Sequence, residues 1–421
     1  MINDFLEFVK KSTCAYTTVE TVKCRLLENN FQELCLEEEW QVELGGKYFV
    51  KVFDSSLIAF SIGKKFGYYD RICIAAAHTD QPGFVIKPNP MMKAGNYQKI
   101  NVESYGGAIL NTWLDRPLGI AGCVISRGSD AFTPKVTIVD SQKPIAMIPN
   151  LAIHFNRDVN KGVELNKQKD MIPLVGMAEE EDGFMDYLAE LSGVAKEEIL
   201  DYQLYLYNTQ EGVRTGFLEE FVMAPRIDNL ASVYACMCGI TGENNGKNLN
   251  VTALFDHEEV GSKTKQGAAS DTLYRILQRI YDSLGRSSEN LEGRIGGGLF
   301  LSLDGAHAQH PNQTEKYDPS NPIYLNDGVV IKKSANQSYA TDAVAAGIVK
   351  ELCKENGISF KEFVNKSDMP GGSTLGAIAS TKMPMRMADV GIPMLAMHSA
   401  METMGAKDLK ALTKLVEAVF S

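Results

Sequence analysis

The chain has 421 residues, of which 44% are apolar and 23% are charged, so it can bury a large core and form more than one domain. Its 53 acidic and 42 basic residues give a net charge of −11 without long blocks of one sign, which argues against nucleic-acid partners and anionic membrane surfaces. No apolar run approaches the ~20 residues of a membrane span, and the first residues lack a signal-peptide pattern, so we expect a cytoplasmic protein with reduced, scattered cysteines.

Residues 1–87 have the pattern of an α/β domain. Thr17 and Glu20 resemble a capping box, and apolar residues at helical spacing follow them, so an amphipathic helix is expected here. An apolar run from Arg71 to His78 predicts a buried strand.

The pattern changes at about residue 88 to short runs between Gly, Pro and Asn clusters. β-Branched and aromatic residues predict strands over residues 120–125, 135–139 and 203–207, and residues 181–200 have a helical pattern. We therefore predict a mainly β insert at 88–208 that interrupts an α/β domain formed by 1–87 and 209–421.

The α/β pattern returns after Pro225. An apolar stripe at helical spacing begins at Asn229, and a last helix is expected through Leu409 and Val419. Further apolar runs predict strands over residues 251–255, 298–304 and 392–398.

Five potential metal ligands fall at or just past the ends of apolar runs. In an open α/β sheet the ends of the strands are where ligands bind, so these side chains are expected to converge. They are His78, Asp228, Glu259, Asp304 and His398. Such a set of nitrogen and oxygen donors indicates a metal-dependent enzyme.

His78 and Asp228 each allow a second interpretation. A histidine after an apolar strand is often only a packed residue, but Asp80 could hold one ring N–H of His78 while the other nitrogen binds a metal. Asp228 precedes a helical stripe and could be its N-cap. If Asn229 caps the helix instead, Asp228 is free to bridge two cations with its two oxygens.

The adjacent carboxylates of Glu258 and Glu259 follow a buried strand, where they repel each other unless cations or donors compensate. Neighbouring residues of an extended segment point in different directions, so one carboxylate can bind a metal while the other faces the water beside it. A metal lowers the pKa of its bound water from ~15.7 towards ~7, and a nearby carboxylate can then act as general base. Hydrolysis is the reaction that this pattern favours.

Asp304 is followed by His307 and His310, which together with the other candidates exceed the ligands that two metals need. One or both are therefore expected to contact substrate or to be structural. The segment from Pro370 to Thr374 suits a tight turn with exposed backbone N–H groups.

With these residues identified, the chain resembles the M18 family of metallo-aminopeptidases, the aspartyl aminopeptidases, over nearly its whole length. Eight motifs in order carry the resemblance. They are Ala77-His78-Thr79-Asp80, Ser104-Tyr105-Gly106-Gly107, Thr112-Trp113-Leu114-Asp115-Arg116, Ile148-Pro149-Asn150-Leu151-Ala152-Ile153-His154, Leu165-Asn166-Lys167-Gln168, Pro225-Arg226-Ile227-Asp228-Asn229-Leu230, Glu258-Glu259-Val260-Gly261-Ser262 and Ala396-Met397-His398-Ser399.

The resemblance implies an α/β, mixed-sheet di-metal peptidase domain with an inserted, mainly β assembly domain. It implies two divalent metal ions, zinc in the first place and cobalt or manganese as alternatives. Asp228 would bridge the two sites, one completed by His78 and Asp304 and the other by Glu259 and His398. Glu258 would be the general base, with Asp80 as a further catalytic residue.

The resemblance also implies a homo-oligomer, a dodecamer built from dimers, that acts on short peptides. His154 would reach a neighbouring subunit's active site. Lys332 would lie near the substrate side chain and select an acidic N-terminal residue. His307 and Tyr339 are the other candidate substrate contacts.

Two departures from the family pattern leave the substrate preference open. The segment Asp256-His257-Glu258-Glu259 has His257 where the family has Asn, and we expect His257 to face solvent. Ser338 stands where a basic residue is frequent, so acidic, neutral and hydrophobic residues all stay candidates. Without the family pattern, Lys332 would be expected to be a solvated lysine at a strand end.

The alternatives in function are a related di-metal dipeptidase or amidohydrolase, and a non-catalytic self-assembling protein stabilised by metals.

Overall fold

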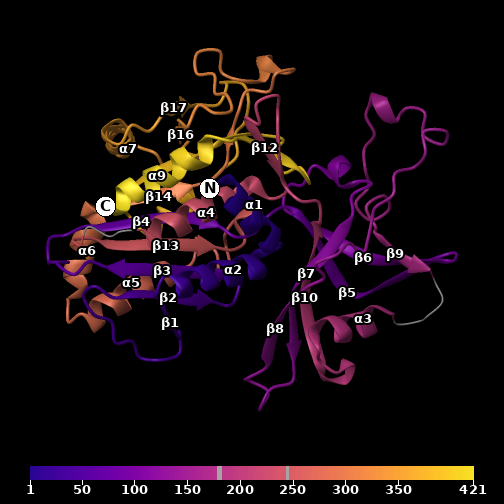
Figure 1. The fold of residues 1–421 in the computed structure, drawn as a ribbon, viewed down its shortest axis with the longest axis horizontal. Helices are drawn as coiled ribbons and strands as arrows, with labels where there is room; N and C mark the ends of the chain where they lie inside the picture. Colours follow the sequence, from indigo (N-terminus) through magenta and orange to yellow (C-terminus); the bar gives the residue numbers. More distant parts are fainter. Residues whose placement is uncertain (178–182, 243–245) are drawn as a thin grey trace.

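The computed structural model describes residues 1–177, 183–242 and 246–421, and three β-sheets organise them (Figure 1). The largest has the strand order β1-β2-β3-β13-β4-β14-β18-β16-β17. Its strands are β1 (Gln32–Leu34), β2 (Lys47–Val52), β3 (Ser56–Ile62), β4 (Ile72–His78), β13 (Leu249–Phe255), β14 (Leu299–Leu303), β16 (Val329–Lys332), β17 (Phe360–Phe363) and β18 (Arg386–Gly391).

The middle of this sheet is parallel and its flanks include antiparallel pairs. β4 pairs in parallel with both β13 and β14, and β14 pairs in parallel with β18. β3 runs antiparallel to β13, and β16 runs antiparallel to β18. The mixed sheet of the predicted fold class is therefore confirmed.

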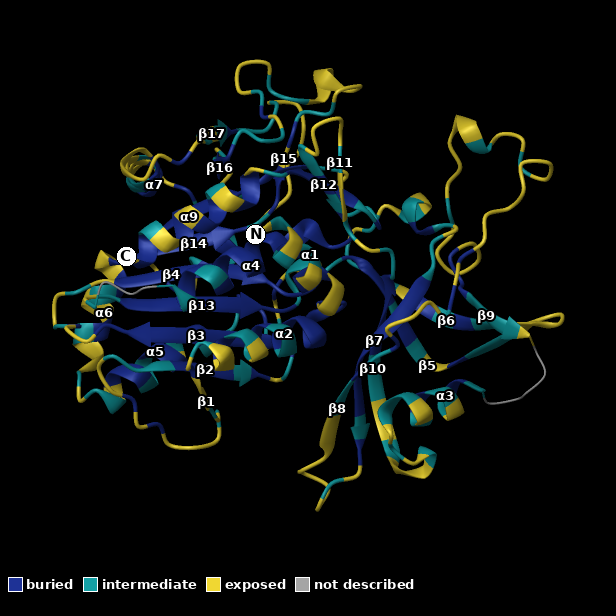
Figure 2. Cartoon of the chain, in the orientation of Figure 1, coloured by how far each residue is buried: buried dark blue, intermediate teal, exposed yellow. Residues whose placement is uncertain are grey.

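Helices cover both faces of the large sheet, and its strands are almost entirely buried (Figure 2). One face packs against α1 (Ile2–Lys11), α2 (Ala15–Glu28), α4 (Ile227–Thr241), α7 (Ala343–Glu355) and α9 (Asp408–Phe420). The other packs against α5 (Thr272–Ser283), α6 (Ser288–Gly297) and α8 (Leu375–Ala379). Because parallel strands are buried on both faces, their sequences are continuous apolar runs.

A second, six-stranded antiparallel sheet lies beside the first in the order β8-β7-β10-β5-β6-β9 (Figure 1). Its elements are β5 (Gly83–Ala94), β6 (Tyr97–Tyr105), β7 (Leu118–Ser126), β8 (Lys135–Asp140), β9 (Leu174–Met177), α3 (Gly183–Ser192) and β10 (Ile199–Asn208). It has its own apolar core around Phe84 and Trp113. β5 crosses residue 88, and the domain boundary there stays a prediction.

The third sheet joins distant parts of the chain in the order β11-β12-β20-β19-β15. Its strands are β11 (Val213–Thr215), β12 (Phe221–Ala224), β15 (Ala306–His307), β19 (Pro393–Leu395) and β20 (Glu402–Gly405). Within the described residues, no helix combines the length and the apolar character needed to cross a bilayer. All eight cysteines are free thiols, and Cys24 and Cys35 are exposed.

Three predictions of local structure are wrong. Thr17 is not an N-cap, because α2 starts one turn earlier with Cys14 as its N-cap, and the Thr17 hydroxyl accepts the Cys14 N–H at 2.9 Å. The helix predicted over 181–200 ends at Ser192 and gives way to β10, while residues 181 and 182 lie outside the described residues. The strand predicted over 392–398 covers only Pro393–Leu395, since Ala396 and His398 adopt positive φ angles of 58° and 67°.

The contact between α4 and α9 provides a test of the packing. A Cβ atom on Gly239 would lie 2.4 Å from Val416 Cγ1, so the two helices approach as closely as a glycine allows. We expect Gly239→Ala to destabilise the protein by about 1–3 kcal/mol, although alanine is the better helix former. Gly347→Ala in α7, where no atom lies within 4 Å of the added methyl, should stabilise by about 0.5–1 kcal/mol.

Thermal or guanidinium unfolding of the two variants measures the difference. The combined variant Gly239→Ala with Val416→Ala should lose less stability than the sum of its single changes, because Val416→Ala removes the overlapping atoms. Equal effects of alanine at positions 239 and 347 would contradict the packing argument.

Candidate metal centre and active site

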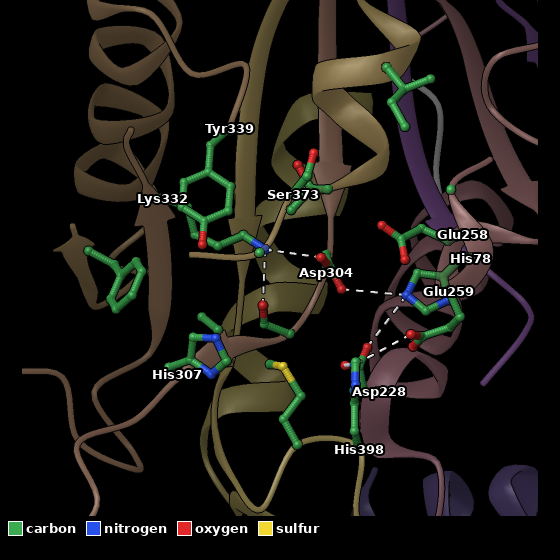
Figure 3. Close-up of a pocket in the computed structure, with 18 residues that line it drawn as sticks. His78, Asp228, Glu258, Glu259, Asp304, His307, Lys332, Tyr339, Ser373 and His398 are labelled. Atoms are coloured by element: carbon green, nitrogen blue, oxygen red, sulfur yellow. Dashed lines mark hydrogen bonds and ion pairs between the residues drawn. The ribbon is translucent and has the colours of Figure 1, made fainter. Parts of the chain in front are cut away.

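The ends of the central strands bring the candidate ligands together. β4 ends at His78, which lies opposite Phe255 at the end of β13, and the parallel β14 ends one residue before Asp304. Glu258 and Glu259 follow β13 in a single 3-10 turn, η4 (Glu258–Val260). These side chains line a cavity of about 410 Å³ (Figure 3).

His78 points one ring nitrogen at two carboxylates. Its side chain is 1% exposed, and Nε2 lies 3.5 Å from both Asp228 Oδ1 and Asp304 Oδ1. Nδ1 lies 3.0 Å from the backbone carbonyl of Asp80, which can only accept, so in the neutral ring Nδ1 carries the hydrogen and Nε2 has the lone pair that a cation can bind. This is the arrangement of a metal-binding histidine.

Asp228 lies between two histidines. Its Oδ1 is 3.5 Å from His78 Nε2, and its Oδ2 is 3.6 Å from His398 Nε2. Its carboxylate does not cap the helix, because no side-chain cap hydrogen bond forms at the start of α4 and Oδ1 has no hydrogen-bond partner among the described residues. Leaving a buried carboxylate oxygen unsatisfied is costly, so Oδ1 is suited to a cation.

His398 and Glu259 complete the other side of Asp228. His398 Nε2 lies 3.4 Å from Glu259 Oε2. Ligand atoms of His78, Asp228 and Glu259 all lie within 4.8 Å of one another. These donors therefore form a cluster suited to a divalent cation.

The protonation equilibria reflect uncompensated negative charge. Burial and the neighbouring carboxylates raise the pKa of Glu258 to about 8, and burial together with Asp228 raises the pKa of Glu259 well above its ordinary value. Burial acts to lower the pKa of His78, but the surrounding carboxylates outweigh it and hold that pKa well above 6.5. The site holds more negative charge than its own side chains neutralise, which is the condition for binding cations.

Asp80 organises the turn that carries the two glutamates. Its Oδ1 accepts the backbone N–H of Glu258 at 3.0 Å, and its Oδ2 accepts that of Glu259 at 3.1 Å. Oδ2 also accepts the Tyr105 hydroxyl at 2.7 Å. Asp80 thus fixes the backbone of η4 as well as contacting His78.

Lys332 lies in the same cavity and is not a solvated strand-end lysine. It is 2% exposed, and its Nζ donates to Asp304 Oδ2 at 3.2 Å and to the Gly305 carbonyl at 2.9 Å. Burial acts to raise the pKa of Asp304, but the Lys332 ammonium overrides it and holds that pKa below its usual range. Tyr339 and His307 line the same side of the cavity as Lys332 (Figure 3).

Other candidates lie elsewhere. His154 is on an exposed loop beside the second sheet and does not line the cavity. His310 also lies outside the cavity lining and accepts the Asn312 N–H. The expectation that His257 faces solvent is wrong, because its side chain is 15% exposed and its Nδ1 lies 2.9 Å from the Thr264 hydroxyl.

Sequence reasoning missed Glu402, which anchors two of the candidate ligands. Its Oε2 accepts the backbone N–H of Asp228 at 2.9 Å, and its Oε1 accepts that of His398 at 2.7 Å. Burial and Asp228 raise its pKa well above the ordinary value. The available signal was a lone glutamate in the otherwise uncharged segment from Met397 to Gly405.

Comparisons with known proteins identify the family of this chain. The family model "Aminopeptidase I zinc metalloprotease (M18)" matches residues 8–420. The probable M18 family aminopeptidase 2 of Clostridium novyi is 44% identical over 96% of this chain and 95% of its own length. Aspartyl aminopeptidase 4 of Saccharomyces cerevisiae is 36% identical over 99% of this chain and 94% of its own.

A solved structure of the mApe1 dodecamer of S. cerevisiae superimposes with a TM-score of 0.86, at 27% identity, over 99% of this chain and 95% of that chain. The family model and the identity to its relatives extend over nearly the whole chain. The protein therefore belongs to the M18 family and is a metallo-aminopeptidase, a hydrolase that acts on peptide bonds.

Proposed function

We propose that this chain removes single N-terminal residues from short peptides, with Glu258 as general base and two cations held around Asp228. The observation that carries the proposal is the placement of the two Asp228 oxygens opposite the two histidines His78 and His398. His78 and Asp304 would hold one cation, and Glu259 and His398 the other, with Asp228 shared. Zinc suits this mixture of imidazole and carboxylate donors, and cobalt and manganese accept it as well.

The residues of the cavity would have different roles in the reaction. When bound, the cations would supply a lowered pKa for water and polarise the scissile carbonyl. Glu258 would take the proton from the attacking water and pass it to the leaving amine. Asp80 would hold Glu258 in place through its backbone N–H.

The preference for the N-terminal side chain is proposed to be acidic. Lys332 lines the cavity on the side of Tyr339 and His307, where the substrate side chain is proposed to bind. Its Nζ lies 5.3 Å from the centre of the Tyr339 ring. A relative of this chain is named an aspartyl aminopeptidase. Apolar residues such as Phe363, Ile378 and Met397 also line the cavity, so neutral and hydrophobic side chains are the competing substrates.

We further propose that the chain forms a homo-oligomer, a dodecamer built from dimers, through the insert at 88–208. The structure of a related protein that resembles this chain is a dodecamer. The loop that carries His154 exposes Leu151, Ile153 and Phe155, with Phe155 81% exposed. Apolar side chains on a projecting loop favour contact with another copy, which would bring His154 towards a neighbouring active site.

Replacing the general base tests the reaction itself. We expect Glu258→Gln to lower kcat by about 10²–10⁴-fold on Asp, Glu, Leu and Ala peptides, while its zinc content stays that of the native protein. Glu315→Gln on an exposed turn is the matched control and should change neither quantity. Hydrolysis of dipeptides alone or cleavage of non-peptide amides would instead favour a related dipeptidase or amidohydrolase, and a native protein that hydrolyses nothing with any metal would overturn the proposal.

A pair of adjacent lysines tests the acidic preference. Lys332→Met should lower the ratio of kcat/KM for an N-terminal Asp peptide to that for a Leu peptide by about tenfold, or about 1.4 kcal/mol. Lys333→Met is the control, because Lys333 is 36% exposed and pairs with Glu362 at 2.6 Å outside the cavity. The ratio of the two kcat/KM values is measured because the loss of the Lys332 partner of Asp304 is expected to lower kcat/KM for both peptides. An unchanged ratio would show that Lys332 does not select the side chain.

The stability of the metal-free protein should fall as the pH rises from about 5 to about 8. Glu258, Glu259 and His78 have pKa values raised by folding, so the folded state binds their protons more tightly than the unfolded chain does. The stability that these protons provide is present at low pH and is lost as the pH rises through the folded-state pKa values.

Thermal unfolding of chelated protein across this range is the measurement. Added zinc should reverse the loss at the alkaline end, because cations replace the protons. Glu258→Gln should show a shallower pH dependence, since one ionising group is gone. A melting temperature of the chelated protein that rises with pH would contradict the charge balance described for the site.

A further inference from the structure

Residues 105–113, which are the last residue of β6 and the connection that follows it, lie against the candidate metal ligands. Tyr105 is the last residue of β6, and its hydroxyl donates to Asp80 Oδ2 at 2.7 Å. The same oxygen accepts the backbone N–H of Glu259 at 3.1 Å. One side chain of the second sheet therefore shares an acceptor with the turn that carries both glutamates.

The next residues of the segment hold His398. The Gly107 carbonyl lies 3.2 Å from His398 Nδ1, and a carbonyl can only accept, so this contact places the hydrogen on Nδ1. Nε2 then presents its lone pair to Asp228 and Glu259. The Ile109 N–H also donates to the His398 carbonyl at 2.9 Å, which fixes the backbone of the same residue.

The segment approaches its neighbours closely at its two glycines. A Cβ atom on Gly106, which has a φ of +65°, would lie 3.1 Å from Glu259 Cβ. A Cβ atom on Gly107 would lie 3.3 Å from His398 Nδ1. The segment is thus packed directly against two of the proposed ligands.

Asp115, two residues beyond this segment, hydrogen-bonds to the exposed loop of the insert. The Asp115 carboxylate accepts the backbone N–H and the side-chain amide of Asn150, both at 2.9 Å. The Asp115 N–H donates to the Ile148 carbonyl at 2.8 Å. Residues 105–115 therefore connect the loop that begins at residue 149 with Asp80 and His398.

We propose that residues 105–113 are a positioning element through which the second sheet sets the geometry of the metal centre, with Tyr105 acting through Asp80 and Gly107 acting through His398. The inference rests on the ligand assignments of the proposed function. Groups that hydrogen-bond to metal ligands orient them and tune their basicity, and their loss lowers metal affinity or activity by about 10–100-fold. The second sheet is then required for metal binding within the chain itself, in addition to any role in assembly.

Tyr105→Phe removes only the hydroxyl and is the main test. The matched control is Tyr207→Phe, because the Tyr207 hydroxyl makes an equivalent bond to a carboxylate of the same sheet, Asp140 Oδ1, at 2.6 Å. Zinc dissociation constants are measured by competition with a chromophoric chelator, and the visible absorption of the cobalt-substituted protein reports on ligand geometry. Melting temperature and sedimentation are recorded alongside.

We expect Tyr105→Phe to weaken zinc binding by about 10–100-fold and to alter the cobalt spectrum, with sedimentation unchanged. Tyr207→Phe should match the native protein in both metal readouts. Gly107→Ala provides a second variant, whose added methyl should displace the His398 ring and weaken only one of the two zinc-binding steps.

Native metal affinity and a native cobalt spectrum in both Tyr105→Phe and Gly107→Ala would overturn the proposal. Equal losses in Tyr105→Phe and Tyr207→Phe would also overturn it, because they would show a general effect of removing a buried hydroxyl. These readouts do not depend on peptide hydrolysis, so a native protein that binds zinc but cleaves no peptide would refute the proposed function and leave this inference to be decided by metal affinity.

Discussion

The carboxylates of Asp228, Glu258 and Glu259 lie together beneath the surface, at the carboxyl edge of a sheet that is itself buried on both faces. Taking a carboxylate out of water is costly, and each one adds to the cost of the next. Two neighbouring buried carboxylates, Asp80 and Glu402, are stabilised by backbone N–H donors. His78 and His398 lie 3.4–3.6 Å from Asp228 and Glu259, but Asp228 Oδ1 accepts no hydrogen bond within the described residues, so this part of the site is suited to a cation.

This constraint explains why the candidate ligands come from so many elements. Parallel strands β4 and β14 deliver His78 and Asp304 to one edge, while Asp228 and His398 come from connections with unusual backbone angles. Regular secondary structure supplies the first two positions, because a strand end has a fixed place in the sheet. Irregular segments supply Asp228 and His398, since such segments can place a side chain where no strand ends. The backbone of these segments is held by hydrogen bonds to Glu402 and to residues 105–113.

The sequence allowed prediction of what depends on local pattern. Continuous apolar runs identified β4, β13 and β14, and the polar residues at their ends identified the candidate ligands. The short strand β19 was overestimated because positive φ angles at Ala396 and His398 carry no apolar signature. The roles of Glu402, Tyr105 and Gly107 depend on contacts between residues distant in sequence, and no periodicity reports such contacts. The residue pattern alone favoured a solvated Lys332, and only the family resemblance placed it near the substrate, since its partner Asp304 is 28 residues away.

The pairing of Lys332 with Asp304 links substrate recognition to the metal centre. The ammonium has three donors, and two are used on Asp304 and the Gly305 carbonyl. One donor is left for a substrate carboxylate. The resulting ion pair would be monodentate, unlike the bidentate pair that an arginine forms with a carboxylate. Under the proposed function, a substrate carboxylate competes with Asp304 for the same positive charge, and a cation on Asp304 would reduce that competition. Acidic selectivity would then depend on metal occupancy as well as on the shape of the cavity.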